Sequence, residues 1–432
     1  MKKVGVAILG LGVVGGGTYQ TLVEHREYYR QTQGVDIVVE SVLVRSKKRA
    51  QELGVPEEIL AKTIEEVVAN PAVDIVVETI GGCGAAKEYI LAALGEGKNV
   101  VTANKELICK HSHELERVAK RNGCGLYFEA SCVGGVPIIR TLLDGLQANR
   151  ITEMMGIING TTNYILTKMT KEGADYQEVL KEAQRLGYAE ADPTADVEGY
   201  DATYKLSILA SLAFHTKVPY SKITREGISS IGRKDIRFGK ELGYTLKLLA
   251  IAKNTEKGIE VRVHPTFVRD FHPLAAVNDS YNAVFLRGDS VGDVMLYGKG
   301  AGSFPTASAV VSDVIFAATH SEVKYSTFKN TAAADPSVKF ISNFESAYYI
   351  RLFVEDKAGT LTKITGIFAR YGISIVVVDQ KGRADKNAIG DEARVPLVII
   401  THKTKENSIK NAVAKINETD LAVVRSVIRV ED

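Results

Sequence analysis

The sequence predicts a mixed α/β fold in three parts: a Rossmann-type doubly wound parallel sheet, an α+β domain and a C-terminal ferredoxin-like domain. Short β-branched runs alternate with helical segments over residues 1–150, which is the pattern of βαβ units in a parallel sheet. After about residue 150 the pattern changes to longer helices and separated strands, as in an α+β domain. Residues 347–432 follow the order β-α-β-β-α-β, which is the ferredoxin-like arrangement.

In the first part, helical stretches such as Glu114–Arg121 carry charges on one face and apolar residues on the other. They separate the strands that we expect in this part. These strands are Val4–Leu9, Asp36–Val44, Asp74–Glu78, Asn99–Thr102 and Leu126–Glu129.

The second part, 151–320, ends in an apolar helix, Ala309–Ala318, within a segment of about 303–320 that we expect to pack back on the first part. The expected strands are Glu153–Ile158, Glu260–Phe267, Tyr281–Arg287 and Asp293–Tyr297. The expected helices are Tyr164–Met169, Tyr176–Leu186 and Asp201–Phe214.

A polar stretch, 321–346, is expected to be a linker to the third part, 347–432. The expected strands of the third part are Tyr348–Val354, Ile373–Val378, Val395–Thr401 and Leu421–Val430, and its helices are Leu361–Tyr371 and Ser408–Ile416.

Composition narrows the class of protein. The chain has 432 residues, of which 45% are hydrophobic and 25% charged, and its 54 basic and 52 acidic side chains leave a net charge of +2. This balance predicts neither a nucleic-acid nor a membrane partner, and no apolar run reaches the roughly 18 residues of a transmembrane helix. The cysteines lack CxxC spacing, so we expect reduced thiols and a cytoplasmic location. They are Cys83, Cys109, Cys124 and Cys132.

A glycine-rich turn follows the first strand and opens a helical segment. Its sequence is Gly10-Leu11-Gly12-Val13-Val14-Gly15. In this context the first glycine allows a tight turn, the second lets a pyrophosphate approach the backbone, and the third allows close packing of helix on strand. The helix N-terminus offers free N–H groups to the phosphates. The turn therefore predicts a dinucleotide site.

The second strand indicates which nicotinamide dinucleotide is bound. Sites for NAD place an Asp or Glu at the end of this strand to bind the ribose 2′-hydroxyl. Here the strand runs into Arg45 and contains no acid at that position. Because a guanidinium can bind a 2′-phosphate through two hydrogen bonds, Arg45 favours NADP, with NAD possible as a second substrate.

Acidic residues gather in the segment 187–205, where Asp201 and Lys205 share one face of a helix. Such spacing often marks a surface ion pair. The strongly apolar continuation of this helix indicates burial, however, and a lysine held by a carboxylate at the start of a buried helix could move a proton to or from a substrate oxygen.

Cys132 supports a competing hypothesis, in which its thiol is the acylating nucleophile of a semialdehyde dehydrogenase. Such a thiol needs a nearby base, and His215 or His264 would have to reach it from elsewhere in the chain. We favour the alternative that Cys132 is a small buried residue.

Together these motifs resemble those of homoserine dehydrogenases that carry a C-terminal ACT domain. The resemblance covers essentially the whole chain. Besides the glycine turn it rests on Thr102–Lys105, Glu129–Pro137, Gly156–Tyr164, and Ala189–Pro193 with Asp201 and Lys205. It implies an oxidoreductase that interconverts L-homoserine and L-aspartate 4-semialdehyde with NAD(P), in threonine and methionine biosynthesis. A homodimer or homotetramer is implied, with 1–150 binding NAD(P) and 151–320 serving catalysis and dimerisation.

The resemblance also implies roles for individual residues. Lys205 becomes the proton donor or acceptor at the substrate oxygen, and Asp201 orients it or a bridging water. Glu190 holds the substrate ammonium, with Asp196 in the same pocket. Lys105 contacts both cofactor and substrate, so whether Lys105 or Lys205 transfers the proton stays open.

A monovalent cation, usually sodium, is a further implication of the resemblance. Its implied ligands are Glu129 and the backbone carbonyls of Cys132, Gly134 and Val136. Oxygen ligands of this kind suit a hard ion of low charge. By the same resemblance Gly187, and Gly302 in a second glycine turn, lie against the cofactor.

The tail resembles an ACT domain through Val354–Leu361, in which an Asp-x-x-Gly turn leads into a helix N-terminus. Free N–H groups there can hold an amino-acid carboxylate, and the implied effector is L-threonine. The alternatives are a tail that promotes assembly alone and, for the whole protein, a non-catalytic amino-acid sensor.

Overall fold

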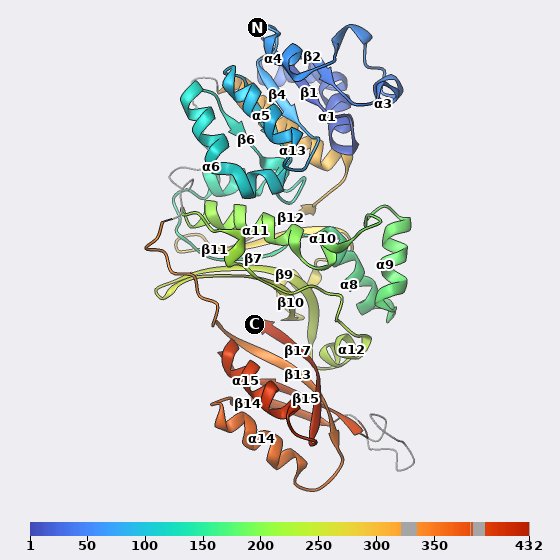
Figure 1. Ribbon diagram of the computed structural model, residues 1–432, viewed down its shortest axis with the longest axis vertical. Helices are drawn as coiled ribbons and strands as arrows, with labels where there is room; N and C mark the ends of the chain where they lie inside the picture. The colour runs from blue at the N-terminus through green and yellow to red at the C-terminus, as the bar shows by residue number, and fades with distance from the viewer. Residues whose placement is uncertain (321–334, 381, 383–393, 432) are drawn as a thin grey trace.

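The computed structural model describes residues 1–320, 335–380, 382 and 394–431. It confirms the predicted fold class: a parallel-sheet unit, a central α+β unit and a ferredoxin-like unit lie one below another in Figure 1. Among the described residues, no helix combines the length and the apolar character that crossing a membrane would require.

The N-terminal unit is built on a parallel sheet with the strand order β3-β2-β1-β4-β5-β6, which is the doubly wound order of dinucleotide-binding sheets. The strands are β1 (Lys2–Leu9), β2 (Val35–Leu43), β3 (Leu60–Ala61), β4 (Ile75–Glu78), β5 (Asn99–Thr102) and β6 (Leu126–Tyr127). The central strand β4 is buried along its whole length and is apolar up to its last residue, Glu78, because helices cover both faces of the sheet. The predicted strand Leu126–Glu129 stops two residues early, since Glu129 belongs to a short 3-10 helix.

Helices of the N-terminal unit cover the sheet, and one of them returns from much later in the chain. They are α1 (Val13–Glu24), α2 (Arg26–Gln33), α3 (Lys47–Glu52), α4 (Ile64–Ala69), α5 (Ala85–Gly95), α6 (Lys105–Asn122) and α13 (Ser303–Thr319). Helix α13 packs against α1 (Figure 1). Ser303 Oγ donates a hydrogen bond to Val13 O at 2.8 Å. A Cβ atom on Gly17 would lie only 2.4 Å from that Oγ, so glycine permits the close approach of the two helices.

The central unit is an antiparallel sheet covered by helices. Its strands are β7 (Ile151–Ile157), β9 (Tyr244–Thr255), β10 (Gly258–Arg269), β11 (Tyr281–Gly288) and β12 (Gly292–Lys299), with the short β8 (Thr224–Arg225) beside β10. Its helices are α7 (Ile138–Arg140), α8 (Gly160–Glu172), α9 (Tyr176–Arg185), α10 (Thr194–Val197), α11 (Tyr200–Ala213) and α12 (Arg233–Glu241). Strand β9 was not predicted; it is apolar on both faces, and such a run has no period-2 alternation.

The C-terminal unit has the strand order β17-β13-β15-β14, and every pair in it is antiparallel. Its elements are β13 (Glu345–Glu355), α14 (Thr360–Arg370), β14 (Ile375–Gln380), β15 (Arg394–Thr401), β16 (Thr404–Lys405), α15 (Glu406–Asn417) and β17 (Ala422–Glu431). Apolar side chains of both helices, such as Phe368 and Ile416, pack against apolar side chains of the strands, such as Ile350 and Ile399, and together they form its core. Of the expected linker 321–346, residues 321–334 lie outside the described residues.

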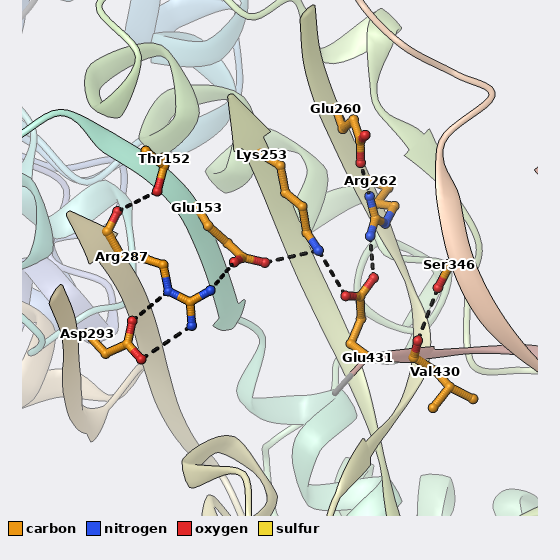
Figure 2. Close-up of polar contacts among 10 residues, drawn as sticks. All are labelled: Thr152, Glu153, Lys253, Glu260, Arg262, Arg287, Asp293, Ser346, Val430 and Glu431. Atoms are coloured by element: carbon orange, nitrogen blue, oxygen red, sulfur yellow. Dashed lines mark hydrogen bonds and ion pairs between the residues drawn. The ribbon is translucent and has the colours of Figure 1, made fainter. Parts of the chain in front are cut away.

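The central and C-terminal units share one sheet of eleven strands, because β17 lies parallel to β10. A chain of ion pairs crosses this junction (Figure 2). Glu431 of β17 binds Lys253 of β9 at 2.9 Å and also pairs with the buried Arg262 of β10. Lys253 in turn binds Glu153 of β7 at 3.0 Å. The C-terminal unit is therefore attached both by backbone hydrogen bonds and by buried charges.

Candidate active site

The glycine turn between β1 and α1 has the geometry of a phosphate-binding loop. Gly10 adopts a φ of +92°, which favours glycine. A Cβ on Gly15 would lie 2.0 Å from Gly10 O, so the third glycine lets the helix approach the turn. A Cβ on Gly12, in contrast, would have no atom within 4 Å. This open side of the turn is where a dinucleotide can contact the backbone, at the N-terminus of α1 formed by Val13 and Val14.

A cavity of about 630 Å³ opens beside this turn and holds several basic side chains. Arg45 lies at the end of β2, as predicted, and Arg49 and Lys62 line the same cavity. No acidic residue lines it. Lys62 was not predicted as a cavity residue. It follows β3, and a strand of two residues is too short to show an alternation of apolar and polar residues in the sequence.

Lys105, Asp201 and Lys205 meet between the N-terminal and central units. Asp201 lies in the first turn of α11 and is 6% exposed. One of its carboxylate oxygens lies 2.7 Å from Lys205 Nζ and the other 3.1 Å from Lys105 Nζ. Lys205 Nζ also donates to Ile158 O at 2.9 Å. A single buried carboxylate thus holds two ammonium groups from two structural units.

Asn159 organises this cluster, and the sequence had given it no role. Its side-chain amide donates to Asp201 Oδ2 at 2.9 Å and to Asp196 Oδ1 at 2.7 Å. Its Oδ1 accepts the backbone N–H of Thr162 at 2.9 Å and thereby caps α8. Both N–H groups and the oxygen of the Asn159 side chain therefore form hydrogen bonds, and they fix the carboxylates of Asp196 and Asp201 relative to the start of α8.

The charges of the cluster shift one another's protonation. Burial opposes ionisation of Asp201, but Lys205 and Lys105 outweigh burial and hold its pKa below the usual range. Asp201 raises the pKa of Lys105 above that of an ordinary lysine. Burial and the neighbouring Asp201 raise the pKa of Asp196. The ionised form of Asp201 and the protonated form of Lys105 are therefore both favoured in the cluster.

The remaining candidate residues lie around the cluster on loops. Glu190 is exposed on the loop after α9, and its carboxylate forms no ion pair with the described residues. The same loop contains Gly187, with a φ of +77°, and is tied to α8 because Thr161 Oγ donates to Tyr188 O at 2.6 Å. Gly302 precedes α13 with a φ of +118°.

The loop 129–136 lies next to the second glycine turn, since Gly135 N donates to Lys299 O at 3.0 Å. Val133 and Gly134 both adopt left-handed conformations, with φ of 58° and 52°. For a buried β-branched residue this conformation is strained. Glu129 accepts backbone N–H groups from Ile139 and Arg140, and burial followed by repulsion from Asp313 raises its pKa to about 7.

Cys132 is fully buried, and burial raises the pKa of its thiol to about 12. Its Sγ contacts Ser131 Oγ at 3.6 Å and Lys205 O at 3.9 Å, and neither is a general base. A nucleophilic thiol needs a lowered pKa and access to substrate, so the structure argues against the acylating role.

In the C-terminal unit the Asp-x-x-Gly turn leads into α14 as expected. Gly359, with a φ of +88°, precedes the first residue of the helix. Gln380 Nε2, from the neighbouring β14, donates to Asp356 Oδ1 at 3.2 Å. The turn is exposed, and its helix N-terminus is open to a small anion.

Comparison with known protein families gives matches to three domain models. Residues 137–315 match the homoserine dehydrogenase domain, residues 10–129 match the homoserine dehydrogenase NAD binding domain, and residues 348–420 match the ACT domain.

Individual relatives cover the chain from end to end. A homoserine dehydrogenase of Bacillus subtilis is 42% identical over 435 residues, covering 100% of this chain and 99% of its own. The crystal structure of a homoserine dehydrogenase from Thiobacillus denitrificans is 42% identical with a TM-score of 0.92, and covers 100% of this chain and 99% of its own. A hyperthermophilic archaeal homoserine dehydrogenase in complex with NADPH is 30% identical with a TM-score of 0.64, and covers 76% of this chain and 100% of its own.

Proposed function

The chain belongs to the homoserine dehydrogenase family, oxidoreductases that act on a CH–OH group, and we propose that it interconverts L-homoserine and L-aspartate 4-semialdehyde with NADP. The observation that carries this proposal is the position of Asp201 between Lys105 and Lys205. The cluster lies where the dinucleotide-binding unit meets the central unit. It therefore supplies proton-transferring groups beside a cofactor site.

Lys205 is the residue to which we assign proton transfer. An ammonium has three N–H donors; Lys205 directs one to Asp201 and one to Ile158 O, and the third remains for a substrate oxygen. In the direction of homoserine oxidation the neutral amine takes the hydroxyl proton, and in the reverse direction the ammonium returns it. The bound dinucleotide supplies or accepts the hydride. Asp201 orients the lysine, and Lys105 adds positive charge next to the reacting oxygen.

Two carboxylates are assigned to the substrate ammonium. Asp196 is held beside the cluster by Asn159, and Glu190 extends from the loop that follows α9. An amino-acid substrate needs acidic groups at a fixed distance from the reacting carbon, and the Asn159 bridge sets that distance for Asp196.

For the cofactor we propose a preference for NADP over NAD. Gly12, Gly15 and the α1 N-terminus fit a pyrophosphate, because the side of Gly12 that would carry a Cβ is open. Arg45 and Lys62 line the adjoining cavity, which has no acidic lining residue to repel a 2′-phosphate. Gly187 and Gly302 are assigned to the cofactor side of the same region.

We propose a monovalent cation, sodium, at the loop 129–136. Carbonyls of Cys132, Gly134 and Val136 with the Glu129 carboxylate would hold it. Two features of the loop fit a cation: the strained left-handed Val133, and a buried carboxylate whose ionised form is disfavoured without an added positive charge. The ion would stabilise this loop next to the Lys299–Gly302 turn.

The test of the reaction is reduced-nicotinamide formation from L-homoserine with NADP and sodium, comparing wild type with Lys205→Ala. We expect a loss of about a hundredfold or more in kcat. The matched control is Lys181→Ala, an exposed lysine of α9, which should leave kcat unchanged. Activity that survives Lys205→Ala moves the proton transfer to Lys105 or to a water molecule. A folded wild type without activity contradicts the proposed reaction.

Cofactor preference is tested by the ratio of kcat/KM for NADP to that for NAD. Arg45→Ala and Lys62→Ala should each lower this ratio about tenfold, because a lost phosphate contact weakens only the phosphorylated dinucleotide. Lys48→Ala is the control, since Lys48 is exposed on the neighbouring α3 and does not line the cavity. An unchanged ratio in both variants would contradict the preference.

For the ACT domain we propose feedback inhibition by L-threonine at the turn before α14. The exposed N-terminus of α14 after Gly359 supports binding of an amino-acid carboxylate. Isothermal titration of the full chain with L-threonine should give saturable heat that Asp356→Ala weakens and that D-threonine does not reproduce. No heat with L-threonine would leave the tail with an assembly role.

We also propose that the chain forms a homo-oligomer, at least a dimer, through the edge of the central sheet. Strand β12 is an edge strand, and its Met295 and Tyr297 are 39% and 53% exposed. Tyr297 stacks on Tyr281. Exposed apolar side chains on a sheet edge favour association. Light scattering on Met295→Asp/Tyr297→Asp should show a smaller species than wild type.

A further inference from the structure

A fully buried carboxylate lies at the end of β4, outside the groups assigned above. Glu78 is the last residue of the strand and is 0% exposed, and within the described residues it forms no ion pair. Burying a charge without an opposite charge is costly unless hydrogen bonds compensate for the lost water. The hydrogen bonds that Glu78 accepts therefore indicate the role of this carboxylate.

One carboxylate oxygen of Glu78 binds the turn that follows β4. Its Oε1 accepts the backbone N–H of Ile80 at 2.7 Å and of Gly81 at 2.9 Å. Ile80 and Thr79 line the cofactor cavity, and Thr79 Oγ donates to Gly10 O at 3.0 Å. This oxygen thus fixes a turn that faces the dinucleotide site and supports the glycine turn.

The other oxygen binds the strand and helix that carry Lys105. Its Oε2 accepts the hydroxyl proton of Thr102 at 2.6 Å, and Thr102 Oγ accepts the backbone N–H of Asn104 at 3.0 Å. Asn104 Oδ1 caps α6 by accepting Leu107 N–H at 3.1 Å, and Lys105 is the first residue of that helix.

The two branches close into a ring, because Asn104 Nδ2 donates to Gly82 O at 2.7 Å. The ring runs from Glu78 through its turn to Gly82 and Asn104, and back through Thr102. Moving the cofactor-side turn therefore moves the N-terminus of the Lys105 helix as well.

We propose that Glu78 is a positioning residue that fixes the cofactor-side turn and the Lys105 helix relative to each other; the proposal rests on the assignment of Lys105 to the reaction. A carboxylate suits this role better than an amide. Its two oxygens accept three hydrogen bonds and donate none. Glutamine at this position would keep its carbonyl oxygen as an acceptor for the turn, but it would present an amide NH2 donor to Thr102 in place of an acceptor.

Substitutions can remove the hydrogen bonds of one branch alone or alter those of both branches. Thr102→Val keeps the shape of the side chain but removes the hydroxyl, so only the branch to Asn104 and Lys105 is lost. Thr102→Ser retains the hydroxyl and is the rescue variant. Glu78→Gln alters both branches. Each full-length variant is compared by melting temperature, by fluorescence titration with NADPH, and by kcat and KM for L-homoserine.

We expect Thr102→Val to lower kcat about tenfold with an unchanged Kd for NADPH, because misplacement of a catalytic side chain reduces turnover. Glu78→Gln should lower kcat similarly and also weaken NADPH binding about fivefold or more. Thr102→Ser should restore kcat to within about twofold. Melting temperatures that fall while kcat and Kd stay at wild-type values would overturn the proposal.

The titration separates this proposal from the assignment of the reaction. A wild type that binds NADPH but does not oxidise L-homoserine contradicts the proposed reaction. In that case the Kd of the Glu78→Gln variant for NADPH still tests the role of Glu78 at the turn. Unchanged NADPH binding in Glu78→Gln contradicts that role even in an active enzyme.

Discussion

Lys105 Nζ lies 3.1 Å from Asp201 Oδ1, and this ion pair joins the N-terminal unit to the central unit. Lys105 begins α6 and Asp201 lies at the start of α11, so each group stands at a helix N-terminus. A carboxylate is stabilised in the first turn of a helix, whereas an ammonium is not. Asp201 therefore supplies Lys105 with a negative charge that offsets its unfavourable position at a helix N-terminus.

Asp201→Asn should change the pH dependence of the reaction. Asp201 raises the pKa of Lys105, so removing its charge lowers that pKa and leaves two ammonium groups close together. We expect kcat to fall about a hundredfold, and the basic limb of the kcat profile to move to lower pH. The exposed Asp192→Asn is the control. An unshifted basic limb would show that Lys105 does not contribute to it.

Asn159→Asp distinguishes two functions of the Asn159 side chain, which are the capping of α8 and the hydrogen-bonded bridge between Asp196 and Asp201. Aspartate keeps an oxygen that can cap α8, but it loses both donors and adds a charge beside Asp196 and Asp201. We expect kcat to fall about tenfold or more. Like charges raise the pKa of the new carboxylate above its unfolded value, so the variant should be least stable at high pH and recover as pH falls.

Melting temperatures at pH 5 and pH 8 test this dependence, with the exposed Asn407→Asp as control. The same loss of stability at both pH values would mean that the bridge carries no electrostatic strain.

Cys132→Ala should leave turnover within about threefold of wild type, because a thiol with a pKa of about 12 is protonated at neutral pH. The folded protein should also resist alkylation of Cys132 by iodoacetamide at pH 8, as measured by peptide mass. Abolished turnover, or rapid labelling of this residue, would revive the acylating hypothesis.

Lys247 makes the stability of the central unit depend on pH. This lysine of β9 is 1% exposed, and burial, with repulsion from Lys171, lowers its pKa to about 8. In the unfolded chain its pKa is about 10.4. Between these values the unfolded state binds more protons than the native state, so the free energy of unfolding rises with pH from about 8 to about 10. Lys247→Met should show a shallower rise in urea titrations; parallel curves would contradict the assignment.

The junction with the C-terminal unit contains a further buried ion pair, which is separate from those of Glu431. Arg351 of β13 donates two hydrogen bonds to Asp235 of α12, at 2.6 and 2.9 Å. Arg351→Met leaves Asp235 buried without an opposite charge among the described residues, with the hydrogen bond from the Tyr349 hydroxyl remaining, which should cost about 3–5 kcal/mol in the free energy of unfolding. Arg351→Met/Asp235→Leu should recover most of that loss, as measured by chemical denaturation. No recovery in the double variant would show that the loss comes from packing.

The sequence predicted those parts of the fold that local pattern determines. Alternating strands and helices identified the first sheet, and the glycine turn located the dinucleotide site. The Asp201–Lys205 spacing gave the ion pair, because residues four apart share a helix face. Strand β9 was missed because both of its faces are buried, which removes the alternation on which a strand prediction depends.

The parts of the site that were missed depend on contacts between distant segments. Asn159 has an ordinary helix-capping position in the sequence, and its second function appears only where α11 brings Asp201 against it. Lys62 follows a strand of two residues, and Glu78 ends a strand whose apolar pattern gives no reason for a buried acid. Charges at the ends of neighbouring parallel strands were the signal that could have found Lys62 and Glu78.

The pairing of β17 with β10 determines how the tail can communicate with the rest of the molecule. Three residue pairs join these strands, from Thr266 and Arg429 to Val268 and Glu431. A tail on a flexible tether could tumble without disturbing its neighbour, whereas this tail is continuous with the sheet whose strand β7 ends next to Ile158 and Asn159 (Figure 1). A rotation of the tail must either break the pairing of these three residue pairs or bend the sheet. A displacement of the tail by an effector would then be transmitted through the shared sheet to the lysine cluster. The stiffness of that sheet would determine how large the displacement at the cluster is.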